Sequence, residues 1–176
     1  MGRSETWTTW QEGLEELHVG VDQSGVIVAH ALTEATVDDA TTAITLIGTI
    51  HGDVARVTAD TAYDTIAFYD AARARGATVV VPPAKTATVS RRRPRSSARD
   101  RTIKKVKTIG RRRWKKVSGY HQQARVENAF FRYKSIIGNR LRARTLGGQE
   151  AEALLACQVL NAMTDMGRPD SYAIGR

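Results

Sequence analysis

The sequence holds a single cysteine, Cys157, among its 176 residues. One thiol cannot form an internal disulfide, which excludes the disulfide-stapled class of small secreted domains and is typical of a reducing compartment. No apolar run reaches the about 18 residues of a membrane-spanning helix, and the opening stretch, MGRSETWTTW, lacks the apolar core of a signal peptide. These absences predict a cytoplasmic protein without a membrane partner.

Histidine is also scarce, and its four occurrences are not spaced as metal ligands. We therefore expect ordinary strand, loop and helix roles for His18, His30, His51 and His121. There is no internal repeat, and 176 residues suit one domain with a core of its own.

Charge is divided unevenly along the chain. Residues 1–90 hold five Lys and Arg against twelve Asp and Glu, whereas residues 91–116 hold fourteen against one. An acidic body that carries a long basic tract is typical of a phosphate-backbone binder with a carboxylate-lined site. A solvated, disordered charge run would give the same counts, so both interpretations stay open at this point.

The first half of the chain alternates strand and helix signals. Residues 14–22 and 26–33 alternate apolar and polar side chains around a Ser-Gly turn, which predicts a β-hairpin. Thr36, with Asp39 three residues later, predicts the capped start of a helix that runs to about Ile50.

A strand–helix–strand unit follows the hairpin. Residues 54–59 and 77–81 are short β-rich runs, and Asp64 is placed to cap a helix over residues 65–75 between them. Strands joined in this way are parallel. Asp60 therefore lies at the carboxyl end of a parallel strand, where open α/β sheets place ligands and catalysis.

The sequence patterns that predict helices and strands become weaker after this unit. Residues 84–119 are polar and Arg-rich and predict a basic insertion that cannot bury enough apolar surface to order itself. Within it, Ile103, Val106 and Ile109 are spaced for one helical turn, and Trp114 is placed to anchor the far end. Residues 149–166 predict a closing helix. Its apolar stripe consists of Ala151, Leu155, Val159, Ala162, Met163 and Met166.

The stretch YHQQARVENAFFRYK, residues 120–134, predicts a helix with a functional edge. At about 100° per residue, four polar side chains fall on one narrow strip beside the apolar face. They are Tyr120, Gln123, Glu127 and Lys134. A carboxylate at the rim of a core is held rigidly and still reaches water, a metal or a phosphate. Taken alone, Glu127 is more simply a solvated helix residue and Asp60 a turn former.

Taken together, Asp60 and Glu127 suit a carboxylate cluster that holds divalent cations. Phosphodiester chemistry uses two metal ions about 3.5–4 Å apart, and Mg²⁺ prefers hard oxygen ligands. Lys134 would place a positive charge on a phosphate, and Tyr120 would orient a phosphate or a base.

The spacing Tyr120-x2-Gln123-x3-Glu127-x6-Lys134 resembles the Y-x2-R-x3-E-x6-K signature of bacterial insertion-sequence DDE transposases. TADTAYD, which contains Asp60, resembles the setting of that family's second catalytic Asp, and LHVGVDQSGVIVAHALT looks like the hairpin after its first catalytic strand. The resemblance implies an RNase H-like α/β fold, a mixed β-sheet flanked by helices. It also implies that Asp60 and Glu127 are catalytic and bind Mg²⁺ or Mn²⁺.

The resemblance further implies a double-stranded DNA partner, as transposon ends and target, and allows a homo-oligomer. It makes Tyr120, Gln123 and Lys134 DNA-contacting residues. Gln123 replaces the family's Arg, which exchanges a charged bidentate fork for a neutral amide and should weaken the grip on the DNA backbone. The basic tract adds further candidates for DNA contact, namely Arg91, Arg92, Arg93, Arg111, Arg112, Arg113, Lys115 and Lys116.

The family's first catalytic Asp has no counterpart here. It lies on a strand before the hairpin, and residues 1–13 are expected to be irregular and too short for that strand and its loop. The carboxylates in this opening sequence are Glu5, Glu12 and Glu15. Asp22 is a poor substitute because it sits at the turn end of the hairpin's first strand.

We therefore expect an N-terminally truncated, partial catalytic domain over residues 14–168, followed by a tail over residues 169–176. Such a chain would be a transposase by descent but inactive alone, since a metal-dependent strand transferase lacking one carboxylate leaves its metal under-coordinated. A non-catalytic DNA-binding module that uses residues 91–116 and a basic RNA-binding protein stay open as alternatives.

Overall fold

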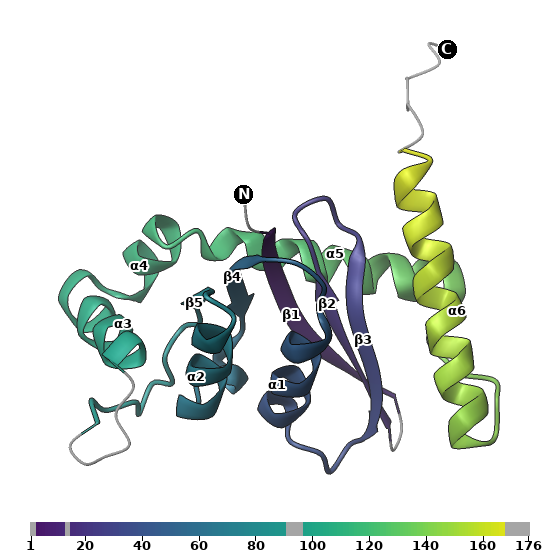
Figure 1. Cartoon of the computed structure of the whole chain (residues 1–176), viewed down its shortest axis with the longest axis horizontal. Coiled ribbons are helices and arrows are strands. Elements are labelled where there is room, and N and C mark those ends of the chain that lie inside the picture. The colour runs from purple at the N-terminus through teal and green to yellow at the C-terminus, as the bar shows by residue number, and fades with distance from the viewer. Residues whose placement is uncertain (1–2, 13–14, 91–96, 168–176) are drawn as a thin grey trace, which may run out of the picture.

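A five-stranded mixed sheet forms the centre of the computed structural model, which describes residues 3–12, 15–90 and 97–167 (Figure 1). The strand order is β3-β2-β1-β4-β5. The strands are β1 (Arg3–Glu12), β2 (Glu15–Val21), β3 (Ile27–Glu34), β4 (Val54–Ala59) and β5 (Thr78–Val80). The three strands β1, β2 and β3 pair antiparallel, whereas β1–β4 and β4–β5 are parallel, as the predicted hairpin and strand–helix–strand unit require.

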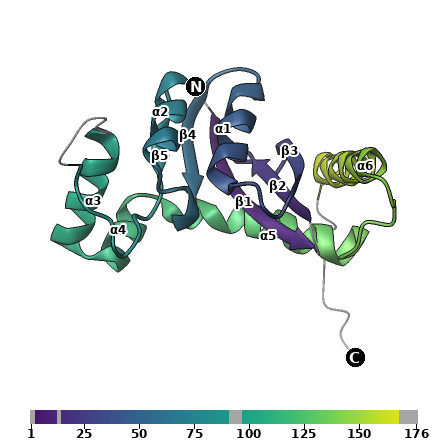
Figure 2. The ribbon, with the colours of Figure 1, turned by 90° about the horizontal axis from the view of Figure 1, so that it is seen from below.

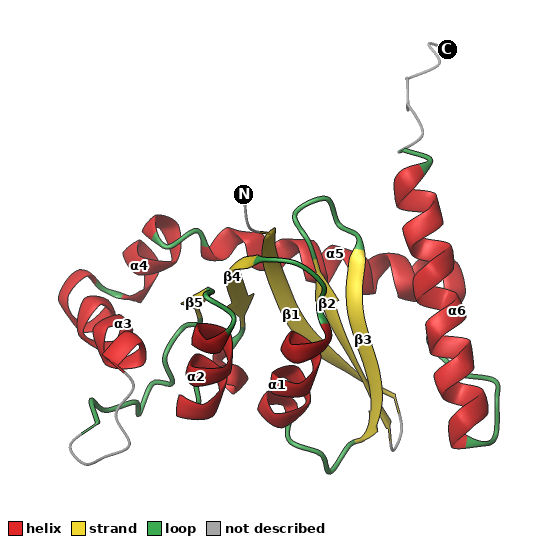
Figure 3. Cartoon of the chain, viewed as in Figure 1, coloured by secondary structure: helices red, strands yellow, loops and turns green. Residues whose placement is uncertain are grey.

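Helices cover both faces of this sheet. They are α1 (Asp39–Thr49), α2 (Ile66–Ala74), α3 (Ser97–Ile109), α4 (Arg111–Val117), α5 (Ala124–Arg132) and α6 (Leu146–Asp165). Short turns η1 (Thr61–Tyr63), η2 (Tyr120–Gln123) and η3 (Tyr133–Ile137) complete the described elements. Figure 2 shows α1 and α2 on one face and α5 across the other, and Figure 3 shows α6 beyond β3 and the α3–α4 pair at the opposite end. Of the helices described, none is long and apolar enough to cross a membrane.

The central strand is β1, so the prediction of irregular structure over residues 1–13 is wrong. It pairs with β2 from Thr6↔Val21 onward and with β4 up to Trp7↔Ala59. A short connection suffices between antiparallel neighbours, which is why the few residues before the hairpin are enough for a strand. The Thr- and Trp-rich sequence favours a strand, but its polar residues hide the alternation that identified the hairpin.

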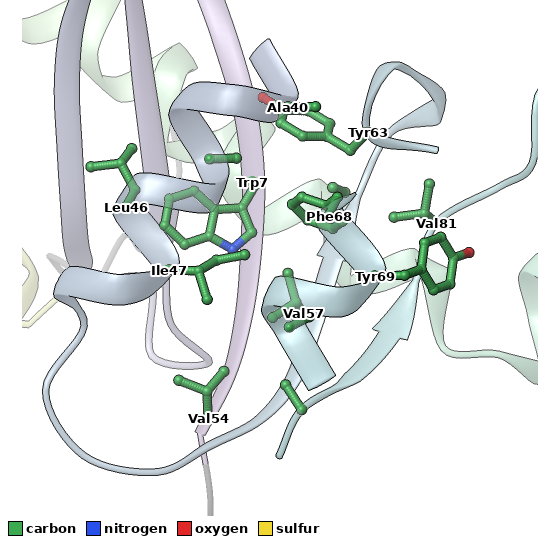
Figure 4. Packing of buried hydrophobic residues seen from close by; sticks show 14 of the residues in the cluster. Trp7, Ala40, Leu46, Ile47, Val54, Val57, Tyr63, Phe68, Tyr69 and Val81 are labelled. Atoms are coloured by element: carbon green, nitrogen blue, oxygen red, sulfur yellow. The ribbon is translucent and has the colours of Figure 1, made fainter. Parts of the chain in front are cut away.

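One core fills the space between the sheet and the α1–α2 layer. The Trp7 side chain is 1% exposed and lies among apolar residues from both helices (Figure 4). Gly20 pairs with Trp7 across β1 and β2, and a Cβ added to Gly20 would lie 2.5 Å from the Trp7 ring. The indole therefore occupies the space that a side chain at position 20 would need.

A second core lies on the other face, between the hairpin and helices α5 and α6. Its buried residues are Leu17, Val19, Val21, Ile27, Val126, Ala129, Phe130, Tyr133, Ala153, Ala156, Cys157 and Leu160. Burial raises the pKa of the Cys157 thiol to about 12, so this cysteine is a packing residue and not a nucleophile.

The caps of the first two helices differ from the prediction by one or two residues. Asp38, rather than Thr36, caps α1, because its carboxylate accepts from the Thr41 N–H at 2.9 Å. Thr65, rather than Asp64, caps α2 through its hydroxyl. The Asp64 carboxylate is instead used in a tertiary contact.

Helix α6 presents the face opposite to the predicted one. The stripe of Ala151, Leu155, Val159, Ala162, Met163 and Met166 is exposed, whereas Ala153, Ala156, Cys157 and Leu160 are buried. Both faces are apolar, so periodicity alone could not choose between them. The smaller side chains on the buried face allow α6 to approach β3 closely. The Asn161 amide fixes α6 against β3, because it accepts from the Ile27 N–H at 2.7 Å and donates to the Ile27 carbonyl at 2.8 Å.

Most of the basic insertion is ordered, contrary to the prediction for residues 84–119. Helices α3 and α4 are held by buried Ile103 and Trp114 and by an ion pair. The Arg99 guanidinium donates to both Asp64 carboxylate oxygens at 2.8 and 2.9 Å, and Asp64 also accepts from the Ala84 N–H at 3.0 Å. Asp64 and Ala84 lie outside the basic tract of residues 91–116, so the composition of the tract alone could not reveal these contacts.

Gly20→Ala tests the packing of Trp7 on the sheet. The new methyl group overlaps a fully buried ring, so we expect a loss of about 1–3 kcal/mol in the free energy of unfolding. The measurement is urea unfolding followed by tryptophan fluorescence. Gly48→Ala is the matched control: no atom lies within 4 Å of its Cβ, and alanine in a helix should leave stability unchanged or raise it by up to about 1 kcal/mol. Equal stability of the two variants would contradict the packing.

Arg99→Met tests the anchor of the basic insertion. It leaves the Asp64 carboxylate, whose side chain is 2% exposed, without its cation, and breaking such a buried pair costs about 3 kcal/mol. We expect faster amide hydrogen exchange throughout α3 together with this loss. Arg101→Met, at an exposed position of the same helix, should stay within about 0.5 kcal/mol of the parent. Unchanged exchange in α3 of Arg99→Met would rule out the anchoring role.

Candidate active site and its basic flank

Asp60 is the first residue after β4, at the carboxyl end of a parallel strand as predicted. Its Oδ1 accepts from the Ala62 N–H at 2.8 Å, which caps η1 and fixes the carboxylate. Partial burial raises the pKa of Asp60, the Ala62 hydrogen bond lowers it, and the negative charge of Asp39 raises it again. The net rise means that the negative charge of Asp60 lacks full compensation, so a cation placed beside it would be favoured.

The predicted helix over residues 120–134 is present as three consecutive pieces. The 3₁₀ turn η2 leads into α5, and α5 passes into the π-helical turn η3. Glu127 lies in the first turn of α5 and Lys134 lies in η3, and both side chains are exposed. The edge of this helical run therefore offers one carboxylate and one ammonium group to the solvent.

Tyr120 joins the predicted residues into one site. Burial raises the pKa of its phenol, the charges of Asp60 and then Glu127 raise it further, and Arg111 lowers it. Both carboxylates therefore act on the same hydroxyl group, although they are 67 positions apart in the sequence. The folded chain thus gathers Asp60, Tyr120 and Glu127 in one neighbourhood.

Helix α4 brings basic residues to the same place. The Trp114 and Tyr120 ring centroids are 6.4 Å apart, and the Lys115 Nζ lies 4.6 Å from the centre of the Tyr120 ring. Such a cation–π contact is typically worth about 0.5–1 kcal/mol near a surface. The Arg111 guanidinium donates to the Pro83 carbonyl and so ties α4 to the loop after β5. The basic tract is therefore attached to the candidate site.

We call the cationic residues of α3 and α4, apart from Arg99 with its Asp64 partner, the basic flank; they are Arg101, Lys104, Lys105, Lys107, Arg111, Arg112, Arg113, Lys115 and Lys116. Arg112, Arg113 and Lys116 are exposed, whereas Arg111 and Lys115 are half-buried. A pocket of about 500 Å³ between the flank and the edge strand β5 includes Arg56 and Arg73 in its lining. The predicted residues Arg91, Arg92 and Arg93 lie outside the described part of the chain.

Gln123 is not placed to contact DNA, which corrects the prediction for that residue. Its side chain is 4% exposed, and its Nε2 donates to the Trp7 carbonyl at 2.8 Å. The prediction used the angular position on an isolated helix, but β1 lies against this edge and covers the amide. Gln123 therefore fastens the η2–α5 run to the central strand.

The sequence of β1 places a threonine directly after Trp7. Trp7 pairs with Ala59, and the next residue on each strand is Thr8 and Asp60. Glu5 is buried and pairs with Val57, further from the strand end. The Asp22 Oδ1 accepts hydrogen bonds from Ser24 and Val26, as a turn residue does. The strand expected to be missing is thus present, but without an acid at this position.

Asp60 and Glu127 suit a hard divalent cation in the type of their ligand atoms but not in their number. Asp60 and Glu127 supply oxygen ligands, and the raised pKa of Asp60 shows an incompletely compensated charge. Two carboxylates form a smaller ligand set than two metal ions require.

Sequence reasoning missed a second polar cluster on the α1 face of the sheet. Ligand atoms of Glu16, His18 and Asp39 all lie within 4.8 Å of one another. Glu16 and His18 alternate with apolar residues on β2, so the sequence did place both on one face. The approach of Asp39 depends on how α1 packs on the sheet, which no local pattern reveals.

Comparison with solved structures supports the predicted fold. The chain is similar to the crystal structure of the catalytic core domain of BIV integrase, with a TM-score of 0.53 and 13% sequence identity. The match covers 97% of this chain and 88% of the integrase chain. The RNase H-like fold, a mixed sheet flanked by helices, is thereby confirmed.

The sequence itself matches a family model. The model is that of the transposase DDE domain, whose members use divalent metal ions, and the match extends over residues 4–162. It therefore includes β1, the strand that holds Thr8, as well as Asp60 and Glu127. Because the match spans most of its length, the chain belongs to the transposase DDE domain family.

Proposed function

We propose that this chain binds double-stranded DNA and holds a phosphodiester at Asp60 and Glu127, but does not complete strand transfer alone. The observation that carries the proposal is the contact of the basic helix α4 with the helical run that holds Glu127: the Trp114 ring lies 6.4 Å from the Tyr120 ring, and the Lys115 Nζ lies 4.6 Å from its centre. A site that combines acidic ligands with adjoining cations suits a metal-dependent reaction on a phosphate backbone. Membership of the transposase DDE domain family supports DNA recombination as the setting.

In this proposal the basic flank and Lys134 contact backbone phosphates, and Tyr120 orients the strand next to the carboxylates. Exposed Arg112, Arg113 and Lys116 extend from the site along α4 and would neutralise successive phosphates. Asp60 and Glu127 would hold Mg²⁺ or Mn²⁺, which activates the attacking oxygen and stabilises the leaving one in phosphodiester transfer. The DNA would be transposon ends and target, met in the cytoplasm.

The incomplete chemistry follows from the central strand. Trp7 pairs with Ala59, the residue before Asp60, and the next residue of β1 is Thr8. In this proposal a carboxylate would be needed at position 8, because a hydroxyl group does not replace a carboxylate as a ligand of a hard cation. Poor placement of the reacting groups by about 1 Å already costs about 100-fold in rate. We therefore expect DNA binding to be retained and strand transfer to be absent.

A second candidate function is a DNA-binding module without any catalytic role. The anchoring of the basic flank favours it, because that anchoring uses Asp64 and the Pro83 carbonyl and does not involve Asp60 or Glu127. A third, RNA-binding, would use the same cations but leaves the association of Asp60, Tyr120 and Glu127 unexplained.

The first test is the salt dependence of binding to duplex DNA. Each phosphate contact contributes a slope of about −0.9 to the plot of log affinity against log salt. The double variant Arg112→Gln/Arg113→Gln should reduce the magnitude of the slope by about 2, because each lost contact removes about one unit. Fluorescence anisotropy of a labelled duplex over several salt concentrations provides the measurement.

Arg140→Gln/Arg144→Gln is the control, since it makes the same change in charge at exposed positions before α6. It should leave the slope nearly unchanged. A slope near zero for the parent would end the DNA-binding proposal, and tighter binding to structured RNA than to duplex DNA would favour the third candidate.

Thr8→Asp tests the missing carboxylate. If the strand position beside Asp60 is the only deficiency, the variant should nick supercoiled plasmid in the presence of Mn²⁺ at least about 100-fold faster than the parent. Thr8→Asn, which has the same shape without the charge, should show no gain. Adding Glu127→Gln to Thr8→Asp should remove the gain.

Nicking by the parent chain that Asp60→Asn abolishes would show that two carboxylates suffice. Nicking by Thr8→Asp that survives Asp60→Asn would place the reaction elsewhere. Either result would contradict the proposed incomplete site.

A further inference from the structure

Three side chains converge on the α1 face of the sheet, away from α5. Glu16 and His18 project from β2, and Asp39 is the first residue of α1. One carboxylate oxygen of each acid and one ring nitrogen of His18 all lie within 4.8 Å of one another. Ligands about 2.0–2.2 Å from a common ion are about 3–4 Å apart, so small rotations of the two carboxylates would complete such a set.

One ring nitrogen of His18 is fixed by a hydrogen bond, as is usual for a histidine that binds a metal through its other nitrogen. Its side chain is 1% exposed, and Nε2 makes a 2.7 Å hydrogen bond with the Thr33 hydroxyl. Among the residues that the structure describes, none hydrogen-bonds to the buried Nδ1. When Nε2–H donates to Thr33, Nδ1 carries the lone pair that a cation accepts, and an anchored second nitrogen is the usual partner of a metal-ligating histidine.

The charges around His18 favour a cation. Burial lowers the pKa of His18, and the charge of Asp39 acts in the opposite direction. Burial raises the pKa of Glu16, and so do the charge of Asp39 and a hydrogen bond with it. Two carboxyl groups in such contact share a proton or bind a cation between them.

We propose that Glu16, His18 and Asp39 form a divalent-metal site, distinct from the Asp60–Glu127 pair, that takes a first-row transition ion of the Zn²⁺ type. An imidazole with two carboxylates suits Zn²⁺ or Co²⁺ better than Mg²⁺, which prefers oxygen ligands alone. Three protein ligands leave room for water at a fourth position. The ion would join α1 to β2 and, through Thr33, to β3.

The site itself does not require the proposed function, because its ligands lie on the face covered by α1, whereas Glu127 belongs to the helix on the other face.

The test is Zn²⁺ binding by the chelator-treated chain, measured by isothermal titration, with Co²⁺ absorption as the spectroscopic readout. We expect one ion per chain and a rise in the unfolding temperature with Zn²⁺ concentration. His18→Gln and Asp39→Asn should each weaken binding by at least about 100-fold. Asp39→Asn keeps the helix start intact, because Asp38 is the cap of α1.

Matched variants separate this site from other binding. Thr33→Val removes only the partner of Nε2 and should weaken Zn²⁺ binding by about 10–100-fold. His30→Gln and Glu34→Gln, on the adjacent strand, should leave binding unchanged. Asp60→Asn/Glu127→Gln should also leave it unchanged, so a failure of the proposed function would not remove the site.

The proposal is overturned if the folded parent binds less than about 0.2 ion per chain at micromolar Zn²⁺. It is equally overturned if folded Asp39→Asn binds as tightly as the parent, or if His30→Gln weakens binding as much as His18→Gln does.

Discussion

The structure depends on the central strand β1, which needs hydrogen-bonded neighbours at both edges and covering layers on both faces. Its edges pair with β2 and β4, Trp7 fills the α1–α2 core on one face, and the η2–α5 run closes the other. The Gln123 amide donates to the Trp7 carbonyl, and the Thr6 hydroxyl donates to the Gln122 carbonyl at 3.5 Å. Buried backbone groups must find partners, so these contacts fix where the helical run sits along the strand. The positions of Glu127 and Lys134 follow from that placement.

This constraint gives a physical account of Gln123. An amide at this buried position donates to the Trp7 carbonyl without bringing a net charge into the core. An Arg side chain at a place 4% exposed would require the desolvation of a guanidinium group, which is costly without an anionic partner. The departure from the signature therefore has a structural role, and it need not be a sign of decay.

The sequence predicted the elements whose signals are local. Alternation identified β2 and β3, and the strand–helix–strand pattern placed Asp60 at the end of β4. Prediction from the sequence failed for β1, because this strand is stabilised by pairing with two neighbours and one of them, β4, lies about 50 residues away in the chain. Prediction also failed for α3 and α4, because the Arg99–Asp64 ion pair and the Arg111–Pro83 hydrogen bond help to hold these helices, and Asp64 and Pro83 lie outside the basic tract. For α6 both faces are apolar, and only the surface offered by β3 decides between them.

The hydrogen bond from Gln123 to Trp7 spans 116 positions of sequence, and this has a consequence for synthesis of the chain. A ribosome synthesises β1 well before the helical run that covers it, and contacts so distant in sequence form slowly. Until α5 and α6 emerge, the hairpin keeps Leu17, Val19 and Val21 without their covering layer. The nascent chain therefore passes through a stage in which the sheet is covered by α1 and α2 only, and its other, apolar face is exposed to solvent. During translation that face is the surface on which chaperones or self-association would act.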